Sequence, residues 1–176
     1  LDSTQSTIFL KNKGMKIGFG SIGKGYAADK GRALMLQHNV EAGIVDASGD
    51  LATWGVQTNH SPWRIGIRNP FKKNKIIKVL KLKDSAVATS GSYEKYAEID
   101  GIRYSHIINP KTGWPATGLT SVTIHGPSAE YANALSTSIM VLGAKEGEKL
   151  MKKNPAYHFI FITDKGKVRH LQDTLL

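Results

Sequence analysis

Residues 105–115 read Ser-His-Ile-Ile-Asn-Pro-Lys-Thr-Gly-Trp-Pro, and this stretch sets the fold of the middle of the chain. Two apolar runs, at 96–99 and 102–108, lead into it and flank Asp100-Gly101. An Asp-Gly pair between two such runs is a strong signal for a tight β-hairpin turn. We therefore expect a hairpin whose second strand carries His106 near its outgoing end.

The rest of the stretch ends that strand and turns the chain. Asn109-Pro110 stops the strand, and Thr112-Gly113 supplies the turn. His106 thus lies next to a polar turn. For an isolated histidine, a buried and hydrogen-bonded structural role is the commoner case. A catalytic role for His106 therefore depends on other polar segments that join it in the fold.

Outward from this hairpin, short strands occur in pairs with a few helices between them. The periodicity of apolar residues predicts strands at 7–10, 15–19, 42–45, 51–54, 63–67, 77–82, 86–89, 119–124, 158–163 and 168–171, and helices at 26–38, 129–142 and 144–153. This order favours an α+β fold with mixed, largely antiparallel sheets and packed helices over a doubly wound one. At 176 residues, a single domain over 1–176 is the default.

A glycine-rich stretch at 18–25, Gly-Phe-Gly-Ser-Ile-Gly-Lys-Gly, leads into the first predicted helix. Free backbone N–H groups at a helix start make a natural cradle for an anion. The spacing of its first three glycines matches the dinucleotide-binding pattern, and the stretch nearly completes a phosphate-binding Walker A loop. The second match fails because Gly25 stands where that loop needs Ser or Thr. A glycine turn for close packing is the alternative.

The predicted helix 129–142 carries a second group of polar residues. Ser128 is a suitable N-cap, and Gly143 ends the apolar stripe. Asn133 and Thr137 are spaced i and i+4 on one face, with Ser136 beside them. These side chains either bond back to the helix or a neighbouring strand, or they provide the oxygen ligands that Mg²⁺ prefers. Small polar turns also follow two predicted strands, at 46–50 and 90–93.

The chain has a net charge of +10 and a pI of about 9.7. Six lysines lie between residues 72 and 83, and from 77 to 82 they alternate with apolar residues. This pattern favours a solvated edge strand over a nucleic-acid groove, because no aromatic platform accompanies the lysines. The absence of Cys excludes disulfides and thiolate metal sites. No apolar run could span a membrane, and without an initiator Met the chain is expected to be a mature or trimmed piece.

Five short motifs together resemble the signatures of the ApbE family, the FAD:protein FMN transferases. They are Gly-Lys-Gly-Tyr-Ala-Ala-Asp at 23–29, Ser-Gly-Asp-Leu at 48–51, Ala-Thr-Ser-Gly-Ser-Tyr-Glu at 88–94, His-Ile-Ile-Asn-Pro-Lys-Thr-Gly at 106–113 and Ala-Asn-Ala-Leu-Ser-Thr at 132–137. The resemblance runs from about Met15 to the end of the chain. It implies an ApbE-like, T-fold-related architecture that corresponds to the C-terminal portion of the family's usual chain. The family's N-terminal part contributes flavin-ring contacts and usually a lipoprotein anchor.

The resemblance also implies a reaction. FAD is cleaved at its pyrophosphate, FMN passes to a Thr or Ser hydroxyl of an acceptor protein through a phosphoester bond, and AMP leaves. Such a transfer needs in-line positioning, a cation on the phosphates and a base for the hydroxyl. His106 is the expected base. The residues that carry over as Mg²⁺ ligands are Ser21 through its backbone oxygen, Asn133 and Thr137, and those that carry over as flavin nucleotide contacts are Gly18, Lys24 and Ile108.

The chain departs from the family pattern at Gly18, Asn109 and Asn133, where Asp is common. Asn109 removes a charge next to His106, and Asn133 replaces an anionic ligand with an amide. We therefore expect a transferase with an altered metal demand. The alternatives are an FAD-binding or FAD-hydrolysing relative with little protein flavinylation, and a basic nucleic-acid-binding domain. The resemblance implies a membrane redox subunit as acceptor, and a place at the periplasmic or other extracytoplasmic face with any membrane anchor outside this chain.

Overall fold

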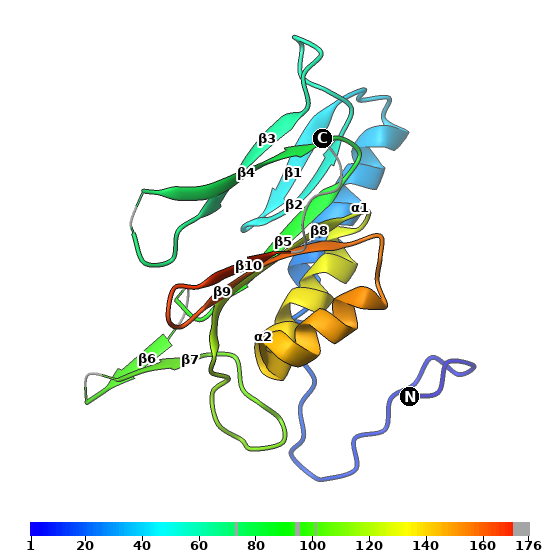
Figure 1. Ribbon diagram of the computed structural model, residues 1–176. Coiled ribbons are helices and arrows are strands. Elements are labelled where there is room, and N and C mark those ends of the chain that lie inside the picture. The colour runs from blue at the N-terminus through cyan, green and yellow to red at the C-terminus, as the bar shows by residue number, and fades with distance from the viewer. Residues whose placement is uncertain (73, 94–95, 101, 171–176) are drawn as a thin grey trace.

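The computed structural model describes residues 1–72, 74–93, 96–100 and 102–170. Two helices and ten strands make up the described part of the chain (Figure 1). In order they are α1 (Gly23–Gln37), β1 (Gly43–Ala47), β2 (Asp50–Trp54), β3 (Trp63–Arg68), β4 (Ile76–Leu82), β5 (Ala86–Gly91), β6 (Tyr96–Ile99), β7 (Ile102–Ser105), β8 (Leu119–Gly126), α2 (Ala129–Lys152), β9 (His158–Thr163) and β10 (Val168–His170).

A six-stranded sheet in the order β1-β2-β5-β8-β9-β10 forms the centre, and every neighbouring pair in it is antiparallel. The other four strands form two hairpins, β3–β4 and β6–β7. This arrangement confirms the predicted α+β class with largely antiparallel sheets. It follows from the short pairs of strands joined by glycine and asparagine turns, which cannot make parallel crossovers.

Different elements pack against the two faces of the central sheet. On β5, Ala88 packs in the cluster that includes the apolar stripe of α2, whereas its neighbour Val87 packs with Leu80 and Leu82 of β4. Because successive residues of a strand point to opposite faces, α2 covers one face and the β3–β4 hairpin covers part of the other (Figure 1). α1 packs against β1, β2 and α2 through a cluster of buried alanines. The helices are therefore fixed to the sheet and to each other.

The start of α2 is held by its own cap and by α1. The Ser128 side chain accepts a hydrogen bond from the Tyr131 N–H, which confirms the predicted N-cap. From α1, the Asp29 carboxylate accepts bonds from the Ser128 hydroxyl at 2.7 Å and from the Glu130 N–H at 3.0 Å. A carboxylate at a helix N-terminus also favours the helix dipole. Gly143, with φ of 79°, breaks α2 where the sequence predicts two helices.

The predicted strands at 7–10 and 15–19 are wrong. The N-terminal 22 residues contain one isolated bridge, between Asp2 and Thr7, and no regular strand. Most of their large apolar side chains are exposed, with Phe9 at 83% and Phe19 at 68%. A short hairpin is stable only when it packs on a sheet or helix, and this segment has no such support among the described residues.

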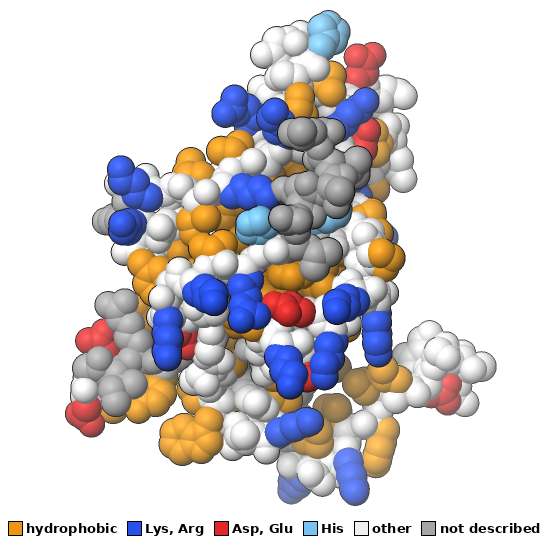
Figure 2. Space-filling view, viewed as in Figure 1, with side chains coloured by type: hydrophobic (Ala, Val, Ile, Leu, Met, Phe, Trp, Pro, Cys, Tyr) orange, Lys and Arg blue, Asp and Glu red, His pale blue; other side chains and the backbone are white. Residues whose placement is uncertain are grey.

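The central hairpin and the lysine-rich strand are confirmed with changed limits. β6 and β7 pair as predicted, but β7 ends at Ser105 rather than 108, so His106 follows the strand directly. β4 pairs only with β3 among the described strands, as expected for an edge. Lys and Arg side chains spread over the face shown in Figure 2, with few acidic side chains between them. The turn residue Gly101, Glu94 of the third motif and the end of the predicted strand 168–171 lie outside the described residues.

Candidate active site

One cavity, of about 530 Å³, collects side chains from all five sequence motifs. It lies where the start of α1, the β1–β2 turn, the end of β5, the segment after β7 and one face of α2 meet. The lining residues are Gly20, Ser21, Lys24, Ser48, Thr89, Ser90, Gly91, His106, Ile107, Asn133 and Thr137. These segments are far apart in the sequence, so the fold itself assembles the site.

His106 reaches the cavity because the chain on both sides of it is fixed by hydrogen bonds. The Ile107 N–H donates to the Ser105 hydroxyl at 3.1 Å, and the Ile107 carbonyl accepts from the Ala116 N–H at 2.8 Å. Ile107 is buried, whereas His106 is exposed. These bonds take the chain away from the β6 edge and explain why β7 stops at Ser105. The imidazole is thus presented to the cavity from a fixed backbone.

Asn133 presents a buried amide oxygen with no partner. The side chain is 2% exposed, and its Oδ1 makes no hydrogen bond with any described residue. An unsatisfied buried acceptor costs about 1–3 kcal/mol, so such an atom indicates a missing ligand. Asn133 lines the cavity together with Thr137, one helical turn further along α2. An oxygen of this kind is suited to a hard cation.

Three hydroxyl groups connect this face of α2 to β5. The Ser90 Oγ lies 2.8 Å from the Ser136 Oγ and 3.0 Å from the Thr137 Oγ1. Ser136 in turn donates to the Asn133 carbonyl at 3.0 Å. All four residues are thereby connected in one hydrogen-bonded network. Thr137 belongs to it through its side chain, and Asn133 belongs to it through its backbone carbonyl only.

Lys24 provides positive charge at the wall of the cavity. Its Nζ lies 3.4 Å from Asp50 Oδ1 and 3.4 Å from the Ser48 carbonyl. Asp50 is fully buried and also accepts from the Thr89 N–H at 3.4 Å. The Lys24 side chain is 35% exposed, so it remains open to the cavity. The carboxylate therefore holds the ammonium group in place at the cavity wall.

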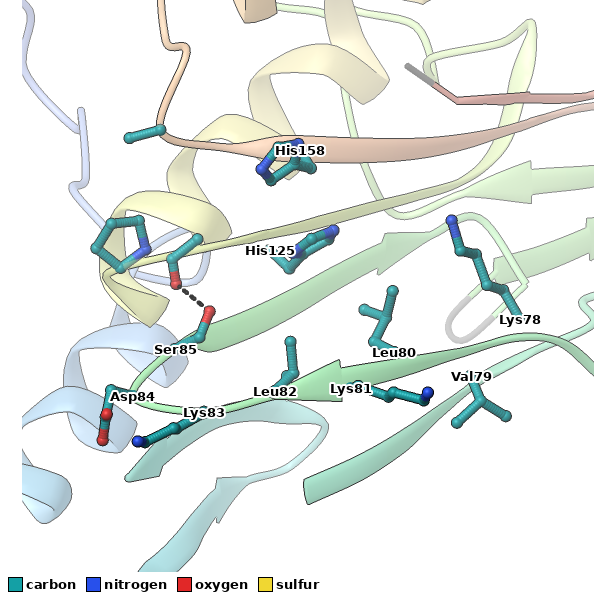
Figure 3. A pocket seen from close by; sticks show the side chains of 13 residues that line it. Lys78, Val79, Leu80, Lys81, Leu82, Lys83, Asp84, Ser85, His125 and His158 are labelled. Atoms are coloured by element: carbon teal, nitrogen blue, oxygen red, sulfur yellow. Dashed lines mark hydrogen bonds between the residues drawn. The ribbon is translucent and has the colours of Figure 1, made fainter. Parts of the chain in front are cut away.

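A larger hollow, of about 750 Å³, lies between β4 and the ends of β8 and β9 (Figure 3). His125 and His158 face each other across the β8–β9 pair, with ring centroids 4.9 Å apart, and Lys78 points toward them in Figure 3. None of the five motifs reaches it. Size alone does not mark the functional site, and the smaller cavity carries the chemistry.

The ApbE family matches residues 1–161 of the chain. The chain belongs to the ApbE family. Among curated relatives, an FAD:protein FMN transferase from Treponema pallidum is 36% identical over 173 residues, covering 93% of this chain and 48% of the relative. An FAD:protein FMN transferase from Klebsiella pneumoniae is 33% identical over 165 residues, covering 93% of this chain and 50% of the relative. The chain thus spans about half the length of the curated relatives that it matches.

Solved ApbE structures share the fold. The ApbE protein from Thermotoga maritima superposes with a TM-score of 0.84 at 39% identity, covering 91% of this chain and 52% of that protein. The flavinyl transferase ApbE from Pseudomonas stutzeri, in its apo form, superposes with a TM-score of 0.76 at 33% identity. This match covers 89% of this chain and 50% of that protein. These likenesses confirm the ApbE-like architecture that the five motifs indicate.

The structure brings five of the seven residues inferred from the ApbE resemblance into one cavity, namely Ser21, Lys24, His106, Asn133 and Thr137. Gly18 and Ile108 do not line it, and Ile108 is 47% exposed. Their roles as flavin contacts stay predictions.

Six lining residues were not among the seven inferred to bind or react, and they are Gly20, Ser48, Thr89, Ser90, Gly91 and Ile107. Ser48, Ser90 and Gly91 belong to the runs of small polar residues that follow predicted strands, at 46–50 and 90–93, whereas Thr89 is the last residue of the predicted strand 86–89. β5 continues to Gly91, so Ser90 lies in the strand and not in a turn.

Proposed function

We propose that this chain forms the phosphoryl-transfer part of a flavin transferase. It moves FMN from FAD to a Thr or Ser hydroxyl of an acceptor protein and releases AMP. The observation that carries this proposal is the convergence of all five motifs on one cavity that holds an imidazole, an ammonium group and two side-chain oxygens. The curated relatives named FAD:protein FMN transferase support it.

We infer that Mg²⁺ binds in this cavity. The residues that would hold it are Ser21 through its backbone oxygen, Asn133 and Thr137, and the unpartnered Asn133 Oδ1 supports this assignment. A cation bound there neutralises charge on the pyrophosphate during transfer. None of the described residues that line the cavity is Asp or Glu. The chain's own ligands are therefore all neutral, in agreement with an altered metal demand.

The other side chains act on the substrate and the acceptor. Lys24 binds the phosphate oxygens, since its ammonium group lies at the cavity wall. His106 takes the proton from the acceptor hydroxyl as that oxygen forms a bond to the FMN phosphorus. The bond from this phosphorus to the bridging oxygen of the pyrophosphate breaks, and that oxygen leaves on AMP. The proton stays on the imidazole until solvent removes it.

The acceptor and its location are proposed from the family resemblance alone. We propose a membrane redox subunit as the acceptor, at the periplasmic or other extracytoplasmic face, with a lipoprotein anchor supplied outside these residues. Within the described part of the chain, neither helix combines the length and apolarity that a membrane crossing requires.

The test incubates the chain with FAD, Mg²⁺ and a Thr-containing acceptor peptide. We expect Mg²⁺-dependent AMP release and a gain of one FMN mass on the peptide. His106→Ala should abolish both products, whereas His38→Ala, which removes an exposed imidazole near the end of α1, should leave them unchanged. AMP and free FMN without modified peptide would identify an FAD hydrolase instead. Unchanged AMP release from His106→Ala would exclude His106 as the base.

A further inference from the structure

Ser90 lies at the centre of the hydroxyl network between β5 and α2. It is 8% exposed, and its Oγ is within hydrogen-bond distance of two hydroxyl groups, those of Ser136 and Thr137. Each hydroxyl carries one proton to donate and two lone pairs that accept. The direction of every bond in this network can therefore be worked out from the one partner that has no proton to give.

That partner is the Asn133 carbonyl, which only accepts. Ser136 donates to it, and this uses the single Ser136 proton. In the 2.8 Å contact between Ser136 and Ser90, Ser90 must then be the donor. In the 3.0 Å contact between Ser90 and Thr137, Ser90 has no proton left, so Thr137 donates. The Thr137 proton therefore points at Ser90 and away from the cavity.

The result is that both lone pairs of the Thr137 oxygen are available to a ligand. A hydroxyl in this orientation can coordinate a cation through its oxygen. It cannot donate a hydrogen bond to a phosphate oxygen. Beside it in the cavity, the Asn133 Oδ1 is also an acceptor without a partner. Partners that fix the orientation of a metal ligand commonly affect metal affinity nearly as much as the ligand itself.

We propose that Ser90 is a positioning residue, which holds the Thr137 hydroxyl as a cation acceptor through the Ser136–Ser90 relay. This inference rests on the proposed cation site. It assigns a task to a residue of the third motif that carries no ligand atom in that site. It also explains why a buried polar network connects β5 to this face of α2, where apolar packing would suffice for stability.

A purely structural role makes a different prediction. If these bonds only fasten α2 to β5, removal of either serine hydroxyl lowers stability and leaves cation affinity unchanged. Under the relay, Ser136→Ala also weakens cation binding, although Ser136 does not line the cavity. Without Ser136, the Ser90 proton is free to turn toward Thr137, and the direction of the last bond is no longer fixed.

The experiment measures Mn²⁺ binding to the whole 176-residue chain by electron paramagnetic resonance of free Mn²⁺, with Mg²⁺ as competitor and no FAD. We expect Ser90→Ala to bind roughly 10- to 100-fold more weakly and Ser136→Ala to show a smaller loss. Ser90→Thr, which keeps the hydroxyl, should restore most of the affinity. Thr123→Val is the control, because it removes a buried hydroxyl that bonds Thr89 outside the relay.

Urea denaturation of each variant shows whether the fold is intact. If wild type binds Mn²⁺ and folded Ser90→Ala binds it equally well, the relay is overturned while the cation site stands. If Thr123→Val weakens binding as much as Ser90→Ala, the effect belongs to general packing and the relay is overturned. If wild type itself binds no Mn²⁺, the cation site fails and the relay fails with it.

Discussion

Asn133→Asp is the substitution that tests the cation site most directly. It keeps the shape of the side chain and turns the unpartnered amide oxygen into a carboxylate oxygen at the same place. Asn133 is 2% exposed, so the new charge would lie in the cavity wall and not in solvent. If Asn133 is a ligand, the variant should bind Mg²⁺ more tightly than wild type in the absence of FAD.

The magnitude follows from the charges. Two unit charges about 4 Å apart attract by about 1 kcal/mol even at the dielectric constant of water, and a divalent cation doubles this lower limit to about 2 kcal/mol. Direct coordination shortens the distance and strengthens the attraction, but desolvation of the carboxylate offsets that gain. A net gain of about 2 kcal/mol corresponds to roughly 30-fold tighter binding.

Isothermal titration calorimetry with Mg²⁺ alone measures this difference. Asn12→Asp, which adds the same charge on the exposed N-terminal segment, should leave the dissociation constant unchanged. Thermal unfolding gives a second readout. A buried carboxylate without a cation destabilises the fold, so the variant should melt below wild type in EDTA and regain stability as Mg²⁺ saturates it. Equal Mg²⁺ affinity in the variant and wild type would refute Asn133 as a ligand.

Three further predictions concern stability. Gly25→Ala should cost about 1–3 kcal/mol in urea denaturation, because its Cβ would overlap a backbone oxygen of α2. Gly23→Ala, with its nearest neighbour 3.8 Å away, should cost nothing. Asp29→Asn should also cost about 1–3 kcal/mol, since Asp29 accepts two hydrogen bonds at the start of α2. Burial raises the pKa of the Tyr157 phenol above its ordinary 10.0. As the pH rises, the unfolded chain therefore loses this proton before the folded chain does, and the free energy of unfolding falls as pH rises past about 10. Tyr157→Phe should lessen that fall, and an equal fall in both proteins would contradict it.

The sequence predicts those parts of this fold that depend on neighbouring residues. The Ser128 cap, the break at Gly143 and the β6–β7 pairing each follow from a few adjacent residues, and the structure has all three. The predicted strands at 7–10 and 15–19 are absent from the structure because strand formation depends on residues elsewhere in the chain. Residues 7–10 form a short apolar run and residues 15–19 alternate, which favours strands locally. A strand forms only where another element supplies hydrogen bonds and an apolar surface, and the local sequence does not carry that information.

Within the site, the residue types were predictable and their connections were not. Asn133 and Thr137 share a helix face because of their spacing, and periodicity alone indicates this. Ser90 was expected to lie in a turn after a strand ending at 89. Its contacts with Ser136 and Thr137 exist because α2 crosses the end of β5, 46 and 47 residues later in the chain. Contacts between residues so far apart in the sequence are set by packing of the whole sheet. A motif therefore shows which residues form the network but not which hydrogen bonds they make.

The charge balance of the cavity connects metal binding to substrate binding. The proposed ligands are a backbone carbonyl, an amide and a hydroxyl, and none of them carries charge. The nearby Asp50 carboxylate does not line the cavity, and its charge is offset by the Lys24 ammonium group at 3.4 Å. In the proposed reaction, the FAD pyrophosphate adds the negative charge that these neutral ligands lack, so FAD should tighten the binding of a divalent cation. Because coupling between two ligands is reciprocal, Mg²⁺ should raise the affinity for FAD by the same factor by which FAD raises that for Mg²⁺. A carboxylate at position 133 would supply part of that charge, so cation binding at the proposed site should depend on FAD more in wild type than in Asn133→Asp.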